Sequence, residues 1–219
     1  MAIHSSRRRL PLAILLLVGL LAGAGAGAGA PASLALDTGT GVLGGNQLAT
    51  AATFCVSAGT RTVTASADSY VSQANPGTNY GTATTLRVQA AASKNQRTLV
   101  AFSLPPAPAH CSLLGATLQL YTTTLKAGRT YQAWQIAAAW SETGVTWANQ
   151  PATTGTAASA TTASGWVSWT VTGEVQAMYA GGNFGFLVRD TTEGTATTYL
   201  NVYSSRTGSH PPQLVLTWG

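Results

Sequence analysis

Charged side chains are scarce in this 219-residue chain, which has 6 acidic residues against 11 Lys and Arg. Three of the basic residues, Arg7–Arg9, lie in a leader, which leaves 8 basic against 6 acidic residues, a formal charge of +2. That balance is not the strongly basic surface of a nucleic-acid-binding protein. We therefore expect no nucleic-acid partner and a surface made mainly of uncharged polar residues.

Residues that usually carry catalysis or hold metals are also few. Outside the leader the only histidines are His110 and His210, and no cluster of Asp or Cys accompanies them to complete a zinc site. Asp68, Asn75 and Asn79 could offer oxygen ligands, but they lack the carboxylate cluster that calcium prefers. Neither a nucleophile elbow nor a phosphate-binding P-loop occurs. We predict no metal and no cofactor.

The first 35 residues predict a secretory signal. The arginines Arg7–Arg9 precede the apolar run Leu10–Leu21, and a stretch of small residues then ends at Ala35. We predict cleavage after Ala35, with Ala28 and Ala30 as rival sites. The protein would then be secreted and extracellular, with no membrane span after cleavage. The alternative is an uncleaved anchor, because the run after the arginines carries no charge.

The chain contains two cysteines, Cys55 and Cys111. An even pair in an exported protein predicts a disulfide, which would contribute about 4 kcal/mol in the chain-entropy model. Two free thiols are the alternative.

The chain divides near residue 60. Residues 36–60 are rich in Gly, Thr and Ala without periodicity, and we predict a flexible N-terminal extension. From residue 61 to 219, short runs rich in Val, Thr, Leu and aromatics alternate with turn residues, as in antiparallel strands. We predict strands at 62–71, 85–90, 97–104, 112–124, 130–140, 166–171, 183–190, 198–205 and 213–218. The pattern predicts one helix over Thr172–Tyr179 with Thr172 as its N-cap.

These elements predict an all-β fold, an antiparallel β-sandwich of jelly-roll type with one short helix. Two strands show clear alternation. In the first, the predicted buried face holds Leu114, Ala116, Leu118 and Leu120. In the second, one face holds Trp134, Ile136, Ala138 and Trp140.

Several segments occur in an order that resembles a known family. They are ASADSYVSQANPGTNYGTATTLRVQ, RTLVAFSLP, GATLQLY, WSETGVTWANQPA, the strand W-x-x-W-T-V-T before the helix, NFGFLVRD, YSSR and HPPQLVLTW. Together they resemble a DNRLRE-type domain of carbohydrate-binding module family 96 over residues 62–218. The resemblance implies a jelly-roll module that binds polysaccharide, acidic polysaccharide included, through Lys, Arg and polar side chains. RTLVAFSL departs from the family pattern, because Ala101 and Ser103 stand where charged residues are usual.

The segment WSETGVTWANQP places Glu142 between Trp140 and Trp147. Glycoside hydrolysis requires two carboxyl groups on a substrate cleft. We interpret Glu142 instead as a structural acceptor for backbone N–H groups. The tryptophans are interpreted as a hydrophobic plug at one end of the sandwich, with a sugar-stacking platform as the alternative.

The candidate glycan site is basic. Arg87, Lys94 and Arg97 lie on a predicted hairpin, where forked guanidinium donors suit carboxylate or sulfate groups, and Tyr80 lies in the preceding loop. Charge that protects a sheet edge is the alternative interpretation. Further tyrosines predicted to be exposed are Tyr70, Tyr121 and Tyr131.

The sequence thus predicts a secreted, monomeric, non-catalytic module that binds polysaccharide. The alternatives are a structural or adhesive cell-surface protein and, as a weaker candidate, a polysaccharide hydrolase or lyase.

Overall fold

The computed structural model describes residues 42–43, 46–47 and 54–219. The predicted signal (1–35), its cleavage site and most of the 36–60 extension lie outside these residues. In a first unit, strand β1 (Val42–Leu43) pairs antiparallel with β2 (Asn46–Gln47). Within the part of the chain that is described, no helix has the length and apolar content needed to cross a membrane.

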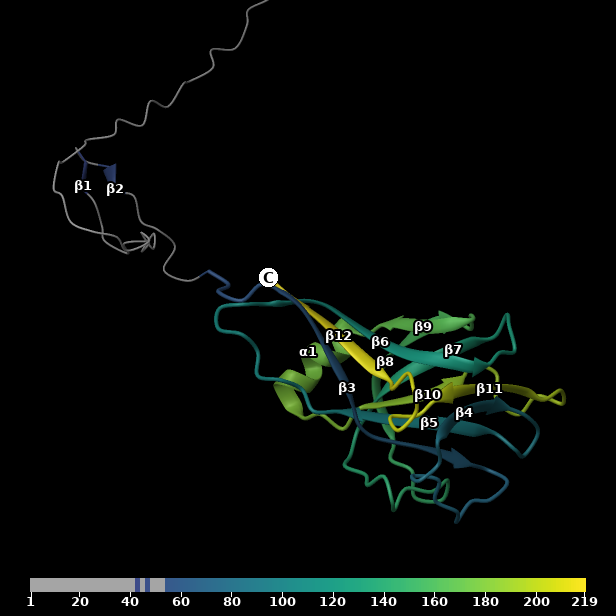
Figure 1. The fold of residues 1–219 in the computed structure, drawn as a ribbon. Helices are drawn as coiled ribbons and strands as arrows, with labels where there is room; N and C mark the ends of the chain where they lie inside the picture. The colour runs from purple at the N-terminus through teal and green to yellow at the C-terminus, as the bar shows by residue number, and fades with distance from the viewer. Residues whose placement is uncertain (1–41, 44–45, 48–53) are drawn as a thin grey trace, which may run out of the picture. The chain divides into compact units, whose positions relative to one another are not determined.

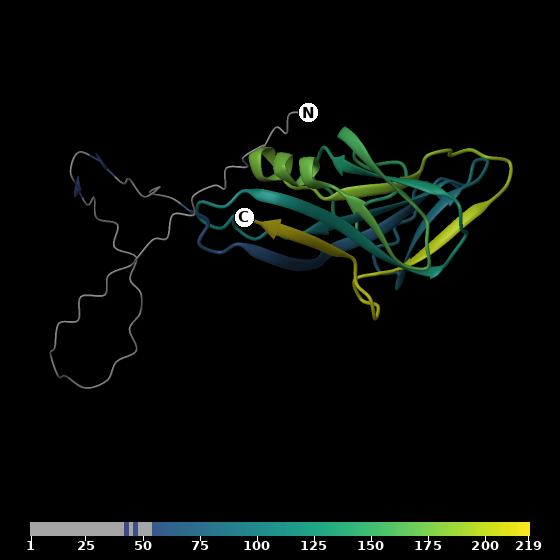
Figure 2. The ribbon, with the colours of Figure 1, turned by 90° about the horizontal axis from the view of Figure 1, so that it is seen from above.

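The second unit, Ala51–Gly219, holds the remaining elements. Its strands are β3 (Gly59–Ser72), β4 (Thr85–Ala90), β5 (Gln96–Phe102), β6 (Leu113–Thr124), β7 (Thr130–Ile136), β8 (Thr153–Thr161), β9 (Gly165–Thr170), β10 (Phe186–Asp190), β11 (Tyr199–Ser204) and β12 (Gln213–Trp218). Its helix is α1 (Thr172–Gly181), which lies at the end where the chain finishes (Figure 2). All paired strands are antiparallel, so the predicted all-β antiparallel fold with one short helix is confirmed.

The strands form one continuous hydrogen-bonded sheet that closes on itself (Figure 1). Its order is β3-β12-β6-β11-β4-β5-β10-β7-β8, with β9 on the free side of β6. An additional pairing between β3 and β5 closes the first six strands of this order into a barrel-like ring. The strands β10, β7 and β8 extend the sheet beyond that ring.

The main core fills the ring and is built by strand alternation. Leu118 and Leu120 on β6 are fully buried, and so are Leu214 and Leu216 on the neighbouring β12. The largest buried side chain is Trp169, whose Nε1 donates to the carbonyl of Tyr131 at 3.0 Å.

The helix covers one end of this core. Its residues Val175 and Met178 are buried against the core. The prediction that Thr172 is the N-cap was wrong. Val171 holds that position without a side-chain cap, and the Thr172 hydroxyl instead accepts from the backbone N–H of Ala116 at 3.0 Å.

A second hydrophobic cluster lies on the other face of β5 and β10. Val100 points into the main core while its neighbour Leu99 points into this second cluster, so β5 is buried on both faces. The cluster consists of Val71, Leu99, Ile136, Val145 and Leu187, with Trp140, Trp147 and Phe184 packed against it.

A register shift corrects the predicted alternation on β6. Leu114 is 64% exposed, and Leu113 takes the buried position at a shift in the β6–β12 pairing. On β7 the alternation holds: Tyr131 and Ala133 lie in the main core, whereas Trp134 and Ile136 share the other face, with Trp134 half-buried. Ala138 and Trp140 lie beyond the end of β7. Strand β8, which the sequence pattern missed, pairs with β7.

The predicted disulfide is confirmed. Cys55 and Cys111 are bonded, with 4.4 Å between their Cα atoms. The bond joins the segment before β3 to the segment before β6. Next to it, Ser112 and Gly219 exchange two backbone hydrogen bonds of 2.8 and 3.1 Å, so the end of the chain is held at the same place.

Candidate functional site

Glu142, Asp68 and Arg206 form a hydrogen-bonded cluster, which we call the clasp, that joins three distant parts of the chain. Both its carboxylate oxygens accept from the guanidinium of Arg206 at 2.6 Å, and Oε1 also accepts from the backbone N–H of Asp68 at 2.9 Å. The hydrogen bonds from Arg206 lower the pKa of Glu142. The structural interpretation of Glu142 is confirmed, although the N–H that it accepts comes from β3 rather than from its own loop.

Asp68 completes this clasp from the inside. It is 2% exposed, and its Oδ2 accepts from the backbone N–H of Arg206 at 2.5 Å. Burial, with a smaller contribution from the nearby Glu142 charge, raises the pKa of Asp68 from 3.8 to about 6.

One raised and one lowered pKa resemble a catalytic pair of carboxyl groups. A hydrolase, however, needs both groups on a cleft with a free oxygen turned to the sugar. Asp68 is buried and both oxygens of Glu142 are bound, so this arrangement supports the fold. In the described part of the chain, no three His, Cys, Asp or Glu side chains are grouped to hold a metal ion.

The clasp sits where two long loops, residues 73–84 and 137–152, pack together. The Asn79 amide donates to the carbonyls of Glu142 and Val145 at 2.8 and 2.7 Å, and its Oδ1 accepts from the N–H of Gly81. A Cβ on Gly81 would lie 2.0 Å from the Glu142 carbonyl oxygen, so only glycine fits there. Asn79, considered above as an oxygen ligand, is therefore a bridge between loops. Figure 1 shows both loops on the same side of the unit as β5.

The two tryptophans of the second loop cover the second cluster, as the plug interpretation predicts. Trp140 packs on that cluster, and its Nε1 donates to the carbonyl of Phe184 at 2.8 Å. Trp147 packs on it as well, and its ring lies 4.6 Å from the guanidinium carbon of Arg97.

Of the predicted basic residues, Arg97 is bound within the protein. Its guanidinium makes a two-pronged ion pair with Glu193 at 2.7 and 2.6 Å, and it donates to the Gln150 side chain at 3.1 Å. Lys94 is exposed in the turn before β5.

Arg87 and Tyr80 meet instead at Tyr70. The rings of Tyr70 and Tyr80 stack with centroids 4.2 Å apart, and the Arg87 guanidinium lies 5.4 Å from the Tyr70 ring. Tyr70 pairs with Thr98 on β5, one residue from Arg97, so Tyr70 and Arg97 face opposite sides of the sheet. The structure therefore does not bring Arg87 and Arg97 together.

The prediction of exposed tyrosines was wrong for two of them, which are buried. Tyr70 is 5% exposed and Tyr131 is fully buried. Burial raises the pKa of Tyr131 to about 12. Tyr80 and Tyr121 are half-buried.

The structure places a second cation beside Arg97 that the sequence analysis missed. Leu187 on β10 pairs with Leu99 on β5 and with Trp134 on β7, so these three side chains share a face. Arg189 and Arg97 lie two residues farther along the same face. The Arg189 guanidinium carbon lies 5.1 Å from the Trp134 ring centre.

We call Arg97, Trp147, Arg189 and Trp134 the cation–aromatic band. It runs across β5, β10 and β7, with amides at Gln132 and Gln150 beside it. No single segment of sequence contains it. A signal that could have located it is an Arg on one strand and a Trp on the neighbouring strand, both at positions that alternation assigns to the same face.

A related pair lies where β7 begins. Arg129 lies 4.1 Å from the Tyr199 ring and binds the buried carboxylate of Asp190 at 2.9 and 2.7 Å. This pairing raises the pKa of Arg129. Asp190 thus pairs with Arg129 and not with its chain neighbour Arg189.

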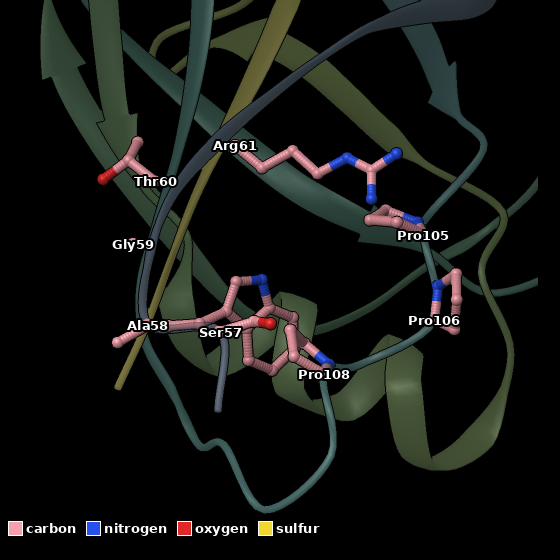
Figure 3. Close-up of a pocket in the computed structure, with 9 residues that line it drawn as sticks. Ser57, Ala58, Gly59, Thr60, Arg61, Pro105, Pro106 and Pro108 are labelled. Carbon is pink, nitrogen blue, oxygen red and sulfur yellow. The ribbon is translucent and has the colours of Figure 1, made fainter. Parts of the chain in front are cut away.

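A pocket of about 220 Å³ lies on another part of the unit, between the start of β3 and the Pro-rich segment after β5 (Figure 3). Pro105, Pro106 and Pro108 form one wall, and the Arg61 side chain extends toward Pro105. Pockets that enclose small molecules are usually about 300 Å³ or larger and hold several converging polar groups. This pocket has one cation, so the cation–aromatic band is the better candidate.

The band can hold a ligand by two kinds of contact. The Arg189 guanidinium offers forked donors to carboxylate, sulfate or hydroxyl oxygens, whereas the donors of Arg97 are bound by Glu193 and Gln150. The indole rings offer apolar surface, and the cations beside them fix their positions.

The chain matches a known protein family. The model of carbohydrate-binding module family 96 matches residues 59–218, from the first residue of β3 to the last of β12. No curated protein matches the chain.

Proposed function

The chain belongs to carbohydrate-binding module family 96, and from this we propose that it is a secreted, non-catalytic module that binds polysaccharide, acidic glycans included. The observation that carries the proposal is the cation–aromatic band on the face of β5, β10 and β7. Each cation lies against an indole ring there, which suits a sugar with an apolar C–H face and anionic or hydroxyl substituents.

The proposed site has one cation that is bound within the protein and one that is available to a ligand. Glu193 and Gln150 bind the donors of Arg97, so Arg97 acts by fixing the Trp147 ring beside it. Arg189 has no acidic partner among the described residues, so its charge is available to an anionic group. Lys94, three residues from Arg97, extends this charge toward the β4–β5 turn, while Arg87 and Tyr80 form a separate proposed patch at Tyr70.

Secretion is proposed from the leader of residues 1–35 alone, with cleavage after Ala35. We propose a jelly-roll connectivity and a DNRLRE-type domain on the order of the strand motifs. A non-catalytic role is supported by Asp68 and Glu142, because the clasp leaves neither carboxyl group free for a sugar. The structural or adhesive role stays as the alternative for a chain that binds no glycan.

The test is affinity electrophoresis in gels that contain polygalacturonate. We expect Arg189→Ala combined with Trp134→Ala to weaken binding about tenfold, since each exposed contact contributes about 1 kcal/mol or less. Retardation of the wild type should also fall as salt rises, because the guanidinium contribution is screened.

Arg61→Ala is the matched control, because it removes one cation from the pocket wall, away from the band. It should retain the wild-type retardation. If the double variant were retarded as strongly as the wild type, the band would not be the site. If the wild type bound none of a panel of anionic and neutral polysaccharides, the binding function itself would be refuted.

A further inference from the structure

The outward face of β3, β12, β6 and β9 is a continuous surface without formal charge. Leu118 and Leu120 on β6, and Leu214 and Leu216 on β12, point inward, so the alternate residues point outward. The outward residues are Thr60, Thr62, Thr64, Gln213, Val215, Thr217, Gly115, Thr117, Gln119, Tyr121, Trp166, Ser168 and Thr170. No Asp, Glu, Lys or Arg holds an outward position on these four described strands. Figure 1 shows β12, β6 and β9 on the side of the unit away from the two long loops.

Three half-buried rings gather at one end of this face. Tyr121 pairs with Trp166 across β6 and β9, and the two rings meet at 78° with centroids 5.3 Å apart. His210, just before β12, stacks on Tyr121 at 3.9 Å and 11°, and it meets Trp166 at 73°. Trp166 is thus stacked face to face with neither neighbour. Aromatic side chains grouped on an otherwise polar sheet face are more typical of a binding surface than of scattered exposed residues.

A row of amide and hydroxyl groups lies next to the rings. Gln119, two residues before Tyr121, is opposite Gln213 on β12 and opposite Ser168 on β9. Its Nε2 donates to the Ser168 hydroxyl at 3.2 Å, which holds the amide in place and leaves its oxygen as an acceptor. Farther along, the hydroxyls of Thr60 and Thr217 lie 3.3 Å apart.

We propose that this face is a second glycan site, which binds a neutral polysaccharide laid across β9, β6 and β12. The rings supply a wall for the C–H face of one sugar, and the amides exchange hydrogen bonds with hydroxyl groups of the next. A ligand without charge fits because the face presents no charged side chain to pair with a carboxylate or a cation on the ligand. The proposal rests on the proposed function, since it assumes a glycan-binding module, but it uses none of the residues of the cation–aromatic band.

The test is affinity electrophoresis of the same protein in gels with hydroxyethyl cellulose or galactomannan, and in a parallel gel with polygalacturonate. We expect Trp166→Ala to weaken binding to at least one neutral glycan about tenfold, the loss typical of a central aromatic contact. Its retardation on polygalacturonate should stay within twofold of the wild type. Arg189→Ala is the matched control and should show the opposite pattern.

Trp166→Phe keeps an aromatic ring at the same place and should restore most of the binding. Gln119→Ala provides a second variant if Trp166→Ala fails to fold, and it should also weaken neutral-glycan binding. Equal retardation of wild type, Trp166→Ala and Gln119→Ala on every neutral gel would refute this second site while leaving the band intact. Retardation of the wild type only on the anionic gel would refute it as well. A wild-type dimer that Trp166→Ala turns into a monomer, seen by sedimentation, would assign the face to a second copy of the chain and overturn the proposal.

Discussion

Replacing Asp68 by asparagine should make the protein more stable at neutral pH and change its stability little near pH 4. The carboxyl group is 2% exposed and lies beside the carboxylate of Glu142, so its charged form is unfavourable in the folded protein. The amide of asparagine has nearly the same shape, and its oxygen still accepts from the backbone N–H of Arg206.

The magnitude follows from the raised pKa of Asp68. A pKa of 3.8 in the unfolded chain and of about 6 in the folded protein differ by an amount worth about 3 kcal/mol, at 1.36 kcal/mol per pH unit. Because the folded pKa is the higher one, the stability linked to the proton is fully present below pH 3.8 and is lost as the pH rises through about 6. Above that pH the substitution should raise the free energy of unfolding by up to about 3 kcal/mol, a Tm increase on the order of 5–10 °C for a domain of this size.

The assay is thermal unfolding, followed by circular dichroism, of wild type and Asp68→Asn from pH 4 to pH 8. The difference between the two proteins at each pH removes the contributions of all other titrating groups. Asp190→Asn is the control, since Asp190 is equally buried but binds Arg129 through two hydrogen bonds, so this change should lower stability at neutral pH. A Tm difference for Asp68→Asn that is negative above pH 6, or that does not vary with pH, would refute the reasoning.

Two further predictions concern the same fold. Glu142→Gln should lower the free energy of unfolding by about 1–2 kcal/mol, because it weakens the ion pair with the partly exposed Arg206. It should remove no activity. If the wild type cleaved a glycan and this change abolished the cleavage, the structural role of Glu142 would be contradicted. Cys55→Ser combined with Cys111→Ser should lower Tm on the order of 10 °C, as reduction of the wild type should, since the bond closes a loop of 56 residues; two alkylatable thiols in the unreduced protein would overturn this.

Alternation predicted most strands closely, and β4 and β12 match the predicted bounds residue for residue. It failed where one extra residue shifts the register, as at Leu114, because a bulge depends on the neighbouring strand and has no local signal. Strand β8 was missed because its Thr, Ala, Ser and Gly residues show no apolar alternation; pairing with β7 along one edge holds it. The pairing of β3 with β5, which closes the ring, likewise could not be predicted from a local sequence pattern.

The candidate site was predictable only in its residue types. The sequence identified Arg97 and Trp147 as separate features and could not place one over the other. Their contact depends on how a loop more than forty residues away folds over β5. Glu142 is similar, since its role as an N–H acceptor was predicted but its partner Arg206, 64 residues along the chain, was not. Contacts between loops are set by packing and not by any period in the sequence.

The pairing of β3 with β12 has a mechanical consequence. Gly59, where the matched domain begins, lies opposite Trp218, where it ends; β3 leads away from that point, and the antiparallel β12 leads back to it. A pull that separates the two ends therefore loads this ladder one rung at a time, as in opening a zipper, and does not load all rungs together in shear. A module held by one end bears no such load across its sheet. Under tension, the fold is thus better suited to hang from a single tether than to act as a link within a strained chain.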